Sequence, residues 1–212
     1  ELTALTCCHK LALTFQAEVF RHPIGSGKRP MSHGLRANDA GGIDKKPRRF
    51  VFVMLDNYTL LSFASALDCL RLANRRVSTP CFEWILIGEG GESAVSSTGT
   101  ELKLDDDLID LHRDDTIILC GGIEIQRATT KKLLNWLRRE SRRGVSVGGL
   151  CTAAFTMAKA GLLDNKKATI HWENQDSFAE EFPEVDLCNS VFCIDGNHIT
   201  TAGGTASNDM SL

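Results

Sequence analysis

The stretch that decides the fold is Val145-Ser-Val-Gly-Gly-Leu-Cys-Thr-Ala-Ala-Phe155. Its first six residues have the apolar, β-branched character of a buried strand, and residues 152–161 favour a helix. Cys151 therefore stands on a tight turn that leads from a strand into a helix. Such a turn lifts a side chain above the carboxyl edge of a parallel sheet, where α/β proteins bind their ligands. The sequence thus predicts a ligand pocket at Cys151.

Strands and helices alternate on both sides of this turn. Continuous apolar runs predict strands that are buried on both faces, whereas apolar residues spaced by three or four predict amphipathic helices. The predicted strands are residues 49–55, 82–88, 94–97, 101–104, 116–120, 145–150 and 168–171, with a hairpin of 191–195 and 198–201 around Gly196-Asn197. The predicted helices are residues 59–74, 129–143, 152–161 and 172–182, with a last helix from Thr205. This alternation indicates an α/β fold, a doubly wound, mostly parallel sheet flanked by helices on both faces.

Composition excludes several classes of protein. The 212 residues are 42% hydrophobic and carry a formal net charge of -3, which fits a single globular domain and no nucleic-acid-binding surface. The lysines and arginines of residues 129–143 are attributed to solvent and to the helix dipole. Any contact with DNA is therefore expected from outside this chain. No apolar run is long enough to cross a membrane, so no membrane partner is predicted.

The eight cysteines do not form a recognisable metal or disulfide pattern. There is no C-x-x-C pair, no cluster with zinc-ligand spacing and no secretory signal pattern. Most of the cysteines lie inside apolar runs, where a thiol behaves as a small hydrophobic group. We therefore expect reduced thiols, a cytoplasmic location, no metal and no cofactor.

The two ends of the chain differ from its centre. Residues 1–48 mix scattered histidines, glycines and a basic cluster, and are predicted to be a disordered extension, so that the domain covers residues 49–212. The chain begins with Glu1 and stops inside the helix predicted from Thr205. It is therefore expected to be part of a longer protein.

Three features are predicted to meet at the carboxyl edge of the sheet. Cys151 lies at a helix N-terminus, whose dipole favours a thiolate. Gly121-Gly122 ends a neighbouring strand, where backbone N–H groups can approach a ligand oxygen. His171 ends a later predicted strand, within possible reach of the sulfur. A simple turn at Gly121-Gly122 and a hydrogen-bonded core histidine at His171 are equally open alternatives.

Several further motifs carry a family resemblance. They are Asp115-Thr-Ile-Ile-Leu-Cys-Gly-Gly122, Gly149-Leu-Cys-Thr152, Ala160-Gly-Leu-Leu-Asp164, Ala168-Thr-Ile-His-Trp172 and Thr200-Thr-Ala-Gly-Gly-Thr-Ala206. With these motifs the chain resembles the ThiJ/PfpI branch of the class I glutamine amidotransferase-like superfamily. Within that branch it is most similar to the sensor domain of GlxA-type regulators of the AraC family. The resemblance implies a flavodoxin-like fold.

The resemblance also assigns residues to the site. A reactive cysteine followed by a histidine in this superfamily corresponds to Cys151 and His171, here as vestigial catalytic candidates. The acidic partner near the first helix falls on Ser62, which cannot supply a negative charge. The family glycine two residues after the cysteine is Ala153. The expected ligand-binding residues are Ser62, Gly121, Gly122, Cys151, Thr152, His171 and Trp172.

The resemblance implies a ligand-sensing and dimerisation domain of a transcriptional regulator. Its effector would be a small nitrogenous metabolite, a quaternary amine or an amino acid, with Trp172 available for a cation–π contact. DNA would be bound only through a C-terminal helix-turn-helix domain that is absent from this chain, and the protein would be a homodimer.

Two other functions remain as alternatives. The first is a cysteine-dependent hydrolase, amidase or glyoxalase-like enzyme that uses Cys151 and His171. The second is a redox or electrophile sensor that acts through Cys151. The serine in place of a carboxylate argues against the enzyme.

Overall fold

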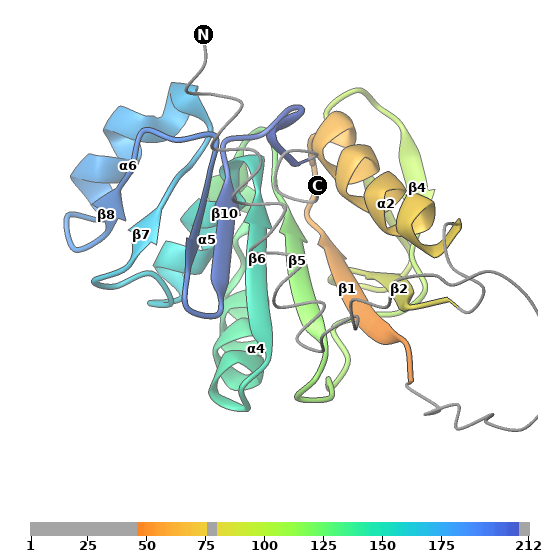
Figure 1. Cartoon of the computed structure of the whole chain (residues 1–212). Helices are drawn as coiled ribbons and strands as arrows, with labels where there is room; N and C mark the ends of the chain where they lie inside the picture. The colour runs from red at the N-terminus through yellow and green to blue at the C-terminus, as the bar shows by residue number, and fades with distance from the viewer. Residues whose placement is uncertain (1–45, 76–79, 208–212) are drawn as a thin grey trace, which may run out of the picture. The chain divides into compact units, whose positions relative to one another are not determined.

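The structure, a computed structural model, describes residues 46–75 and 80–207. Within these ranges six strands form a sheet in the order β2-β1-β5-β6-β10-β9 (Figure 1). The strands are β1 (Arg48–Met54), β2 (Phe82–Ile87), β5 (Thr116–Cys120), β6 (Ser146–Leu150), β9 (Phe192–Asp195) and β10 (His198–Thr201). All neighbouring pairs are parallel except β9 and β10, which form the hairpin predicted around Gly196-Asn197. The predicted doubly wound, mostly parallel α/β fold is confirmed.

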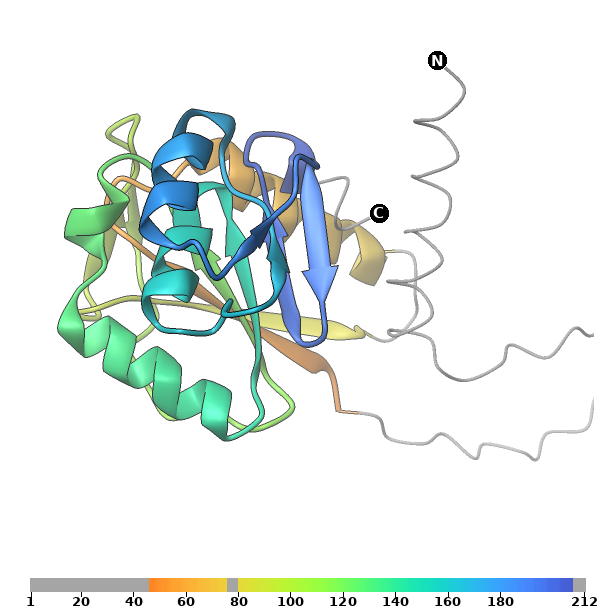
Figure 2. The same cartoon turned by 90° about the vertical axis from the view of Figure 1, so that its left-hand side faces the viewer.

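Helices cover both faces of this sheet (Figure 2). They are α2 (Leu60–Arg75), α3 (Ile125–Ala128), α4 (Lys131–Arg142), α5 (Ala154–Lys159) and α6 (Gln175–Glu181), with the short 3₁₀ turns η1 (Cys151–Ala153) and η2 (Trp172–Asn174). Successive residues of β1 point to opposite faces, so Phe52 packs in one core with α2, and Val53 packs in the other with α4 and α5. The central strands are buried because each face carries its own hydrophobic core.

The strand predicted at residues 168–171 is wrong for most of its length. Only β7 (Lys167–Ala168) forms, and it pairs with β8 (Asp186–Leu187) in a separate two-stranded sheet. The backbone N–H of Thr169 donates to the Thr200 hydroxyl at 2.9 Å, and the Thr169 hydroxyl donates to the carbonyl of Ser190 at 2.6 Å. Bonds to side chains therefore replace a strand ladder after Ala168.

Smaller differences concern the short elements. The predicted strands at residues 94–97 and 101–104 are the antiparallel pair β3 (Ser93–Val95) and β4 (Glu101–Lys103). Helix α3 was not predicted, and the helix predicted at residues 172–182 is divided into η2 and α6. The predicted extension at residues 1–48 and the helix predicted from Thr205 lie largely outside the described residues.

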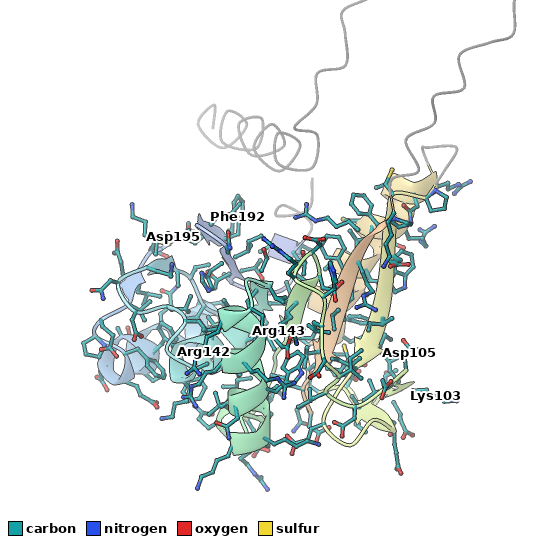
Figure 3. All side chains as sticks on the ribbon, turned by 90° about the horizontal axis from the view of Figure 1, so that it is seen from below. Lys103, Asp105, Arg142, Arg143, Phe192 and Asp195 are labelled. Atoms are coloured by element: carbon teal, nitrogen blue, oxygen red, sulfur yellow. The ribbon has the colours of Figure 1, made fainter. Side chains whose placement is uncertain are left out.

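The basic side of α4 is attached to the fold by a buried carboxylate. Glu140 is fully buried, and its carboxylate pairs with Arg139 at 2.9 Å and with Arg143 at 3.0 Å. The Glu140 carboxylate also accepts the backbone N–H of Leu111 at 3.3 Å. Figure 3 shows Arg143 beside Arg142 at the end of this helix. These contacts give the arginines a structural role within the domain.

A search of the described helices for a membrane span found none with the necessary length and apolar character.

Candidate functional site

The turn at Cys151 has an unusual backbone conformation. Cys151 follows the last residue of β6 with φ of 61°, a left-handed conformation that is uncommon for residues other than glycine. Its N–H donates to the Thr201 hydroxyl at 3.4 Å, and its carbonyl accepts the N–H of His171 at 3.3 Å. Two segments far apart in sequence therefore hold the turn in place.

The Cys151 thiol is buried and has one hydroxyl partner. Its residue is 4% exposed, and the Thr59 hydroxyl donates to Sγ at 3.3 Å. Burial raises the pKa of the Cys151 thiol, although the Thr59 hydroxyl and the N–H of Thr152 act in the opposite direction. The shift is contrary to the thiolate predicted from the helix N-terminus, because burial outweighs the donors. Burial therefore favours the protonated thiol over the thiolate.

His171 lies beside the turn without a hydrogen bond to the sulfur. In the described part of the chain, no hydrogen bond joins its ring nitrogens to Cys151 Sγ. The His171 Nδ1 atom lies 3.7 Å from a carboxylate oxygen of Glu173, and the ring lies 5.7 Å from that of Trp172. A Cβ added to Gly203 would lie 2.9 Å from Cys151 Sγ and 3.1 Å from His171 Cδ2. The backbone of Gly203 therefore packs against both side chains and leaves no room for a side chain of its own.

A pocket of about 390 Å³ opens at this turn. The residues that line it are Thr59, Ser97, Gly122, Ile123, Glu124, Ile125, Gln126, Cys151, Thr152, His171, Glu173 and Asn174. Among these described residues there are two carboxylates and no lysine or arginine. One of these carboxylates, Glu124, pairs with Arg127 at 3.2 Å, so Glu173 is the main acidic group beside the partly buried imidazole of His171.

Four of the expected ligand-binding residues meet in this pocket. They are Gly122, Cys151, Thr152 and His171. Gly121 is not among the lining residues, and its N–H donates to the carbonyl of Leu150 at 3.3 Å. The Thr152 hydroxyl donates to the carbonyl of Gly122 at 2.7 Å and so joins the ends of β5 and β6.

Trp172 and Ser62 are not among the lining residues. Trp172 is 70% exposed in η2, next to His171 and Glu173. Ser62 is buried in α2, and its hydroxyl has no hydrogen-bond partner among the described residues. The hydroxyl that reaches the thiol belongs to Thr59, three positions earlier. Its position just before a helix was the available signal, because threonine is common at helix N-caps.

No group of three or more His, Cys, Asp or Glu side chains in the described ranges is arranged to hold a metal ion.

Comparison with known proteins supports these observations. The profile of the DJ-1/PfpI family matches residues 48–212. The HTH-type transcriptional regulator CdhR of Pseudomonas aeruginosa is 39% identical over 163 residues, which cover 77% of this chain and 48% of CdhR. The HTH-type transcriptional regulator GlxA of Rhizobium meliloti is 35% identical over 172 residues, which cover 81% of this chain and 53% of GlxA. The chain therefore spans about half the length of the curated relatives it matches.

A solved structure shows the same fold. The crystal structure of an AraC family transcriptional regulator from Pseudomonas putida has a TM-score of 0.67 at 24% identity, covering 78% of this chain and 89% of that one. The resemblance to the ThiJ/PfpI domain of GlxA-type regulators is confirmed, and the chain belongs to the DJ-1/PfpI family.

Proposed function

We propose that this chain is the ligand-sensing domain of a transcriptional regulator. The observation that carries the proposal is a pocket built around a buried thiol, whose pKa is raised by burial and whose hydrogen-bond partner is the Thr59 hydroxyl. Such a thiol can contact a ligand but is a poor nucleophile, since thiolate is the reactive form. The relatives CdhR and GlxA, both named as HTH-type transcriptional regulators, support the same role.

The proposed effector is a small nitrogenous metabolite with a cationic group, either a quaternary amine or an amino acid. Glu173 gives the pocket a negative charge, whereas the other lining carboxylate, Glu124, is paired with Arg127 at 3.2 Å. The exposed indole of Trp172, beside Glu173, offers a face for a cation. The contacts assigned to the ligand are those of Gly122, Cys151, Thr152 and His171.

A cysteine enzyme is less well supported by the same geometry. General-base activation requires a nucleophile within hydrogen-bond reach of its base. In the described residues the Cys151 thiol is bonded to the Thr59 hydroxyl and not to His171. The serine at position 62 supplies no charge to orient an imidazolium. A redox sensor at Cys151 meets the same obstacle of a buried, protonated thiol.

DNA binding is assigned to a part of the full-length protein that this chain does not contain. The matched segment covers 48% of CdhR and 53% of GlxA. Regulators that read paired half-sites act as dimers, so we extend the proposal to a homodimer in the cytoplasm.

Isothermal titration calorimetry tests the proposal directly. The chain is titrated with glycine betaine, carnitine and arginine, and with succinate as an anionic comparison. At least one of the three compounds that carry a cationic group should bind, and Glu173→Gln should weaken its binding by up to about fivefold, as expected for a partly exposed charge pair. The exposed Glu180→Gln in α6 is the matched control and should leave Kd unchanged.

Two outcomes would count against the proposal. If none of the three nitrogenous compounds binds, the effector class is wrong, and equal binding of succinate would remove the charge argument. Rapid, selective alkylation of Cys151 by iodoacetamide at neutral pH would instead favour the enzyme.

A further inference from the structure

Two cysteines outside the pocket converge on the backbone at residues 168–169. The first is Cys188, directly after β8. Its N–H donates to the carbonyl of Ala168 at 2.8 Å, and its thiol contacts the same carbonyl at 3.2 Å. The Cys188 thiol is therefore held against the end of β7.

The second cysteine, Cys193, reaches the same place from β9. It lies opposite Thr200 in the antiparallel ladder of β9 and β10, and opposed residues project from the same face. The Thr200 hydroxyl accepts the N–H of Thr169 at 2.9 Å, which shows that this face looks toward residues 168–169. Figure 3 labels Phe192 and Asp195 at the two ends of this strand.

The electrostatics of Cys193 agree with this placement. Burial, followed by the adjacent Cys188 thiol, raises the pKa of the Cys193 thiol to about 12. Both residues remain partly exposed, so a small molecule in solvent can reach them. The two thiols are neighbours that are open to solvent, unlike the buried Cys151 thiol.

We propose that Cys188 and Cys193 form a reversible dithiol–disulfide site whose oxidant is a low-molecular-weight disulfide. Because its raised pKa disfavours a thiolate at Cys193, the attack starts at Cys188, whose thiol loses its proton, attacks the small disulfide, forms a mixed disulfide and releases one small thiol. The second cysteine then attacks the mixed disulfide at the protein sulfur and releases the other small thiol. The two cysteines lose two electrons and two protons, and the small disulfide gains both.

The loop that this disulfide would close lies next to the effector pocket. The carbonyl of Val191, between the two cysteines, accepts the N–H of Ala202 at 2.8 Å. Ala202 precedes Gly203, which fills the space beside Cys151 and His171. Oxidation would fix the backbone that positions Gly203, so the site is placed to influence ligand binding.

Peptide mass spectrometry tests the proposal on the whole chain. No lysine or arginine follows Lys167, so trypsin releases residues 168–212 as one peptide that holds these two cysteines and no others. The native chain is incubated with oxidised glutathione, blocked with iodoacetamide and digested. The peptide should be lighter than its reduced form by two hydrogen atoms and carry no alkyl group. Dithiothreitol before blocking should restore two alkylated cysteines.

A dithiol reagent provides a second, independent measurement. Phenylarsine oxide should add once to this peptide, and the adduct should be lost in Cys188→Ser and in Cys193→Ser. The exposed Cys81→Ser is the control and should retain it. The proposal is overturned if oxidised glutathione leaves both thiols alkylatable or modifies each one separately. It is also overturned if either single variant keeps the arsenical adduct.

Discussion

Replacing Gly203 with alanine tests how closely the backbone packs on the pocket side chains. Gly203 has φ of +92°, and a new Cβ would lie 2.9 Å from Cys151 Sγ and 3.1 Å from His171 Cδ2. The left-handed conformation costs a residue with a side chain about 1–2 kcal/mol. Crowding against two fixed side chains adds about 1–3 kcal/mol, as in other overpacked sites. Gly203→Ala should therefore lose about 2–5 kcal/mol of unfolding free energy.

Gly144→Ala is the matched control. Gly144 also has φ of +92°, but nothing lies within 4 Å of its added Cβ. This variant experiences the backbone strain alone, so it should be more stable than Gly203→Ala by about 1–3 kcal/mol. Urea denaturation followed by tryptophan fluorescence measures the difference, and a thermal scan should show about 2–4 °C for each kcal/mol. Equal losses in the two variants would refute the packing argument.

Three further predictions concern single contacts. Arg49→Gln removes both hydrogen bonds from the guanidinium to the nearly buried Asp115 carboxylate, at 3.0 and 2.6 Å. The free energy of unfolding measured in urea should fall by about 1–3 kcal/mol, and an unchanged denaturation midpoint would contradict this. Burial lowers the pKa of His198, so its unfolded form binds more protons and stability should fall as pH drops below about 6.5. His198→Gln should flatten that pH dependence, and an equally steep fall in the variant would exclude His198 as its source. Thr59→Val removes a hydroxyl donor that lowers the pKa of the Cys151 thiol, so alkylation of Cys151 should need a higher pH in this variant. An unshifted pH profile of alkylation would show that the hydroxyl has no such effect.

The strands were the most predictable part of the fold. Residues 116–120 were predicted as a strand and form β5 with the same bounds, because every residue is buried between two cores. The hairpin around Gly196-Asn197 was also predicted, since its turn signal is local. These elements are determined by residues that are close together in sequence.

The candidate site was less predictable because its contacts are distant in sequence. Thr59 and Cys151 are 92 residues apart, and no periodic pattern connects them. Gly203 belongs to a motif seen in the sequence, yet its contact with His171 depends on how β10 enters the sheet. The direction of the pKa shift at Cys151 depends on burial, which the sequence of the turn alone does not report.

The walls of the pocket come from both sides of the central sheet. Thr59 lies just before α2, whose apolar side chains belong to one core, and Ile125 in α3 belongs to the other. A molecule that contacts both walls therefore connects the two helical layers. Because a ligand stabilises every unfolding unit that must open to release it, effector binding should slow amide hydrogen exchange in α2 and in α3 together. A bound effector would then be signalled by a simultaneous loss of local motion in the helices on both faces of the sheet.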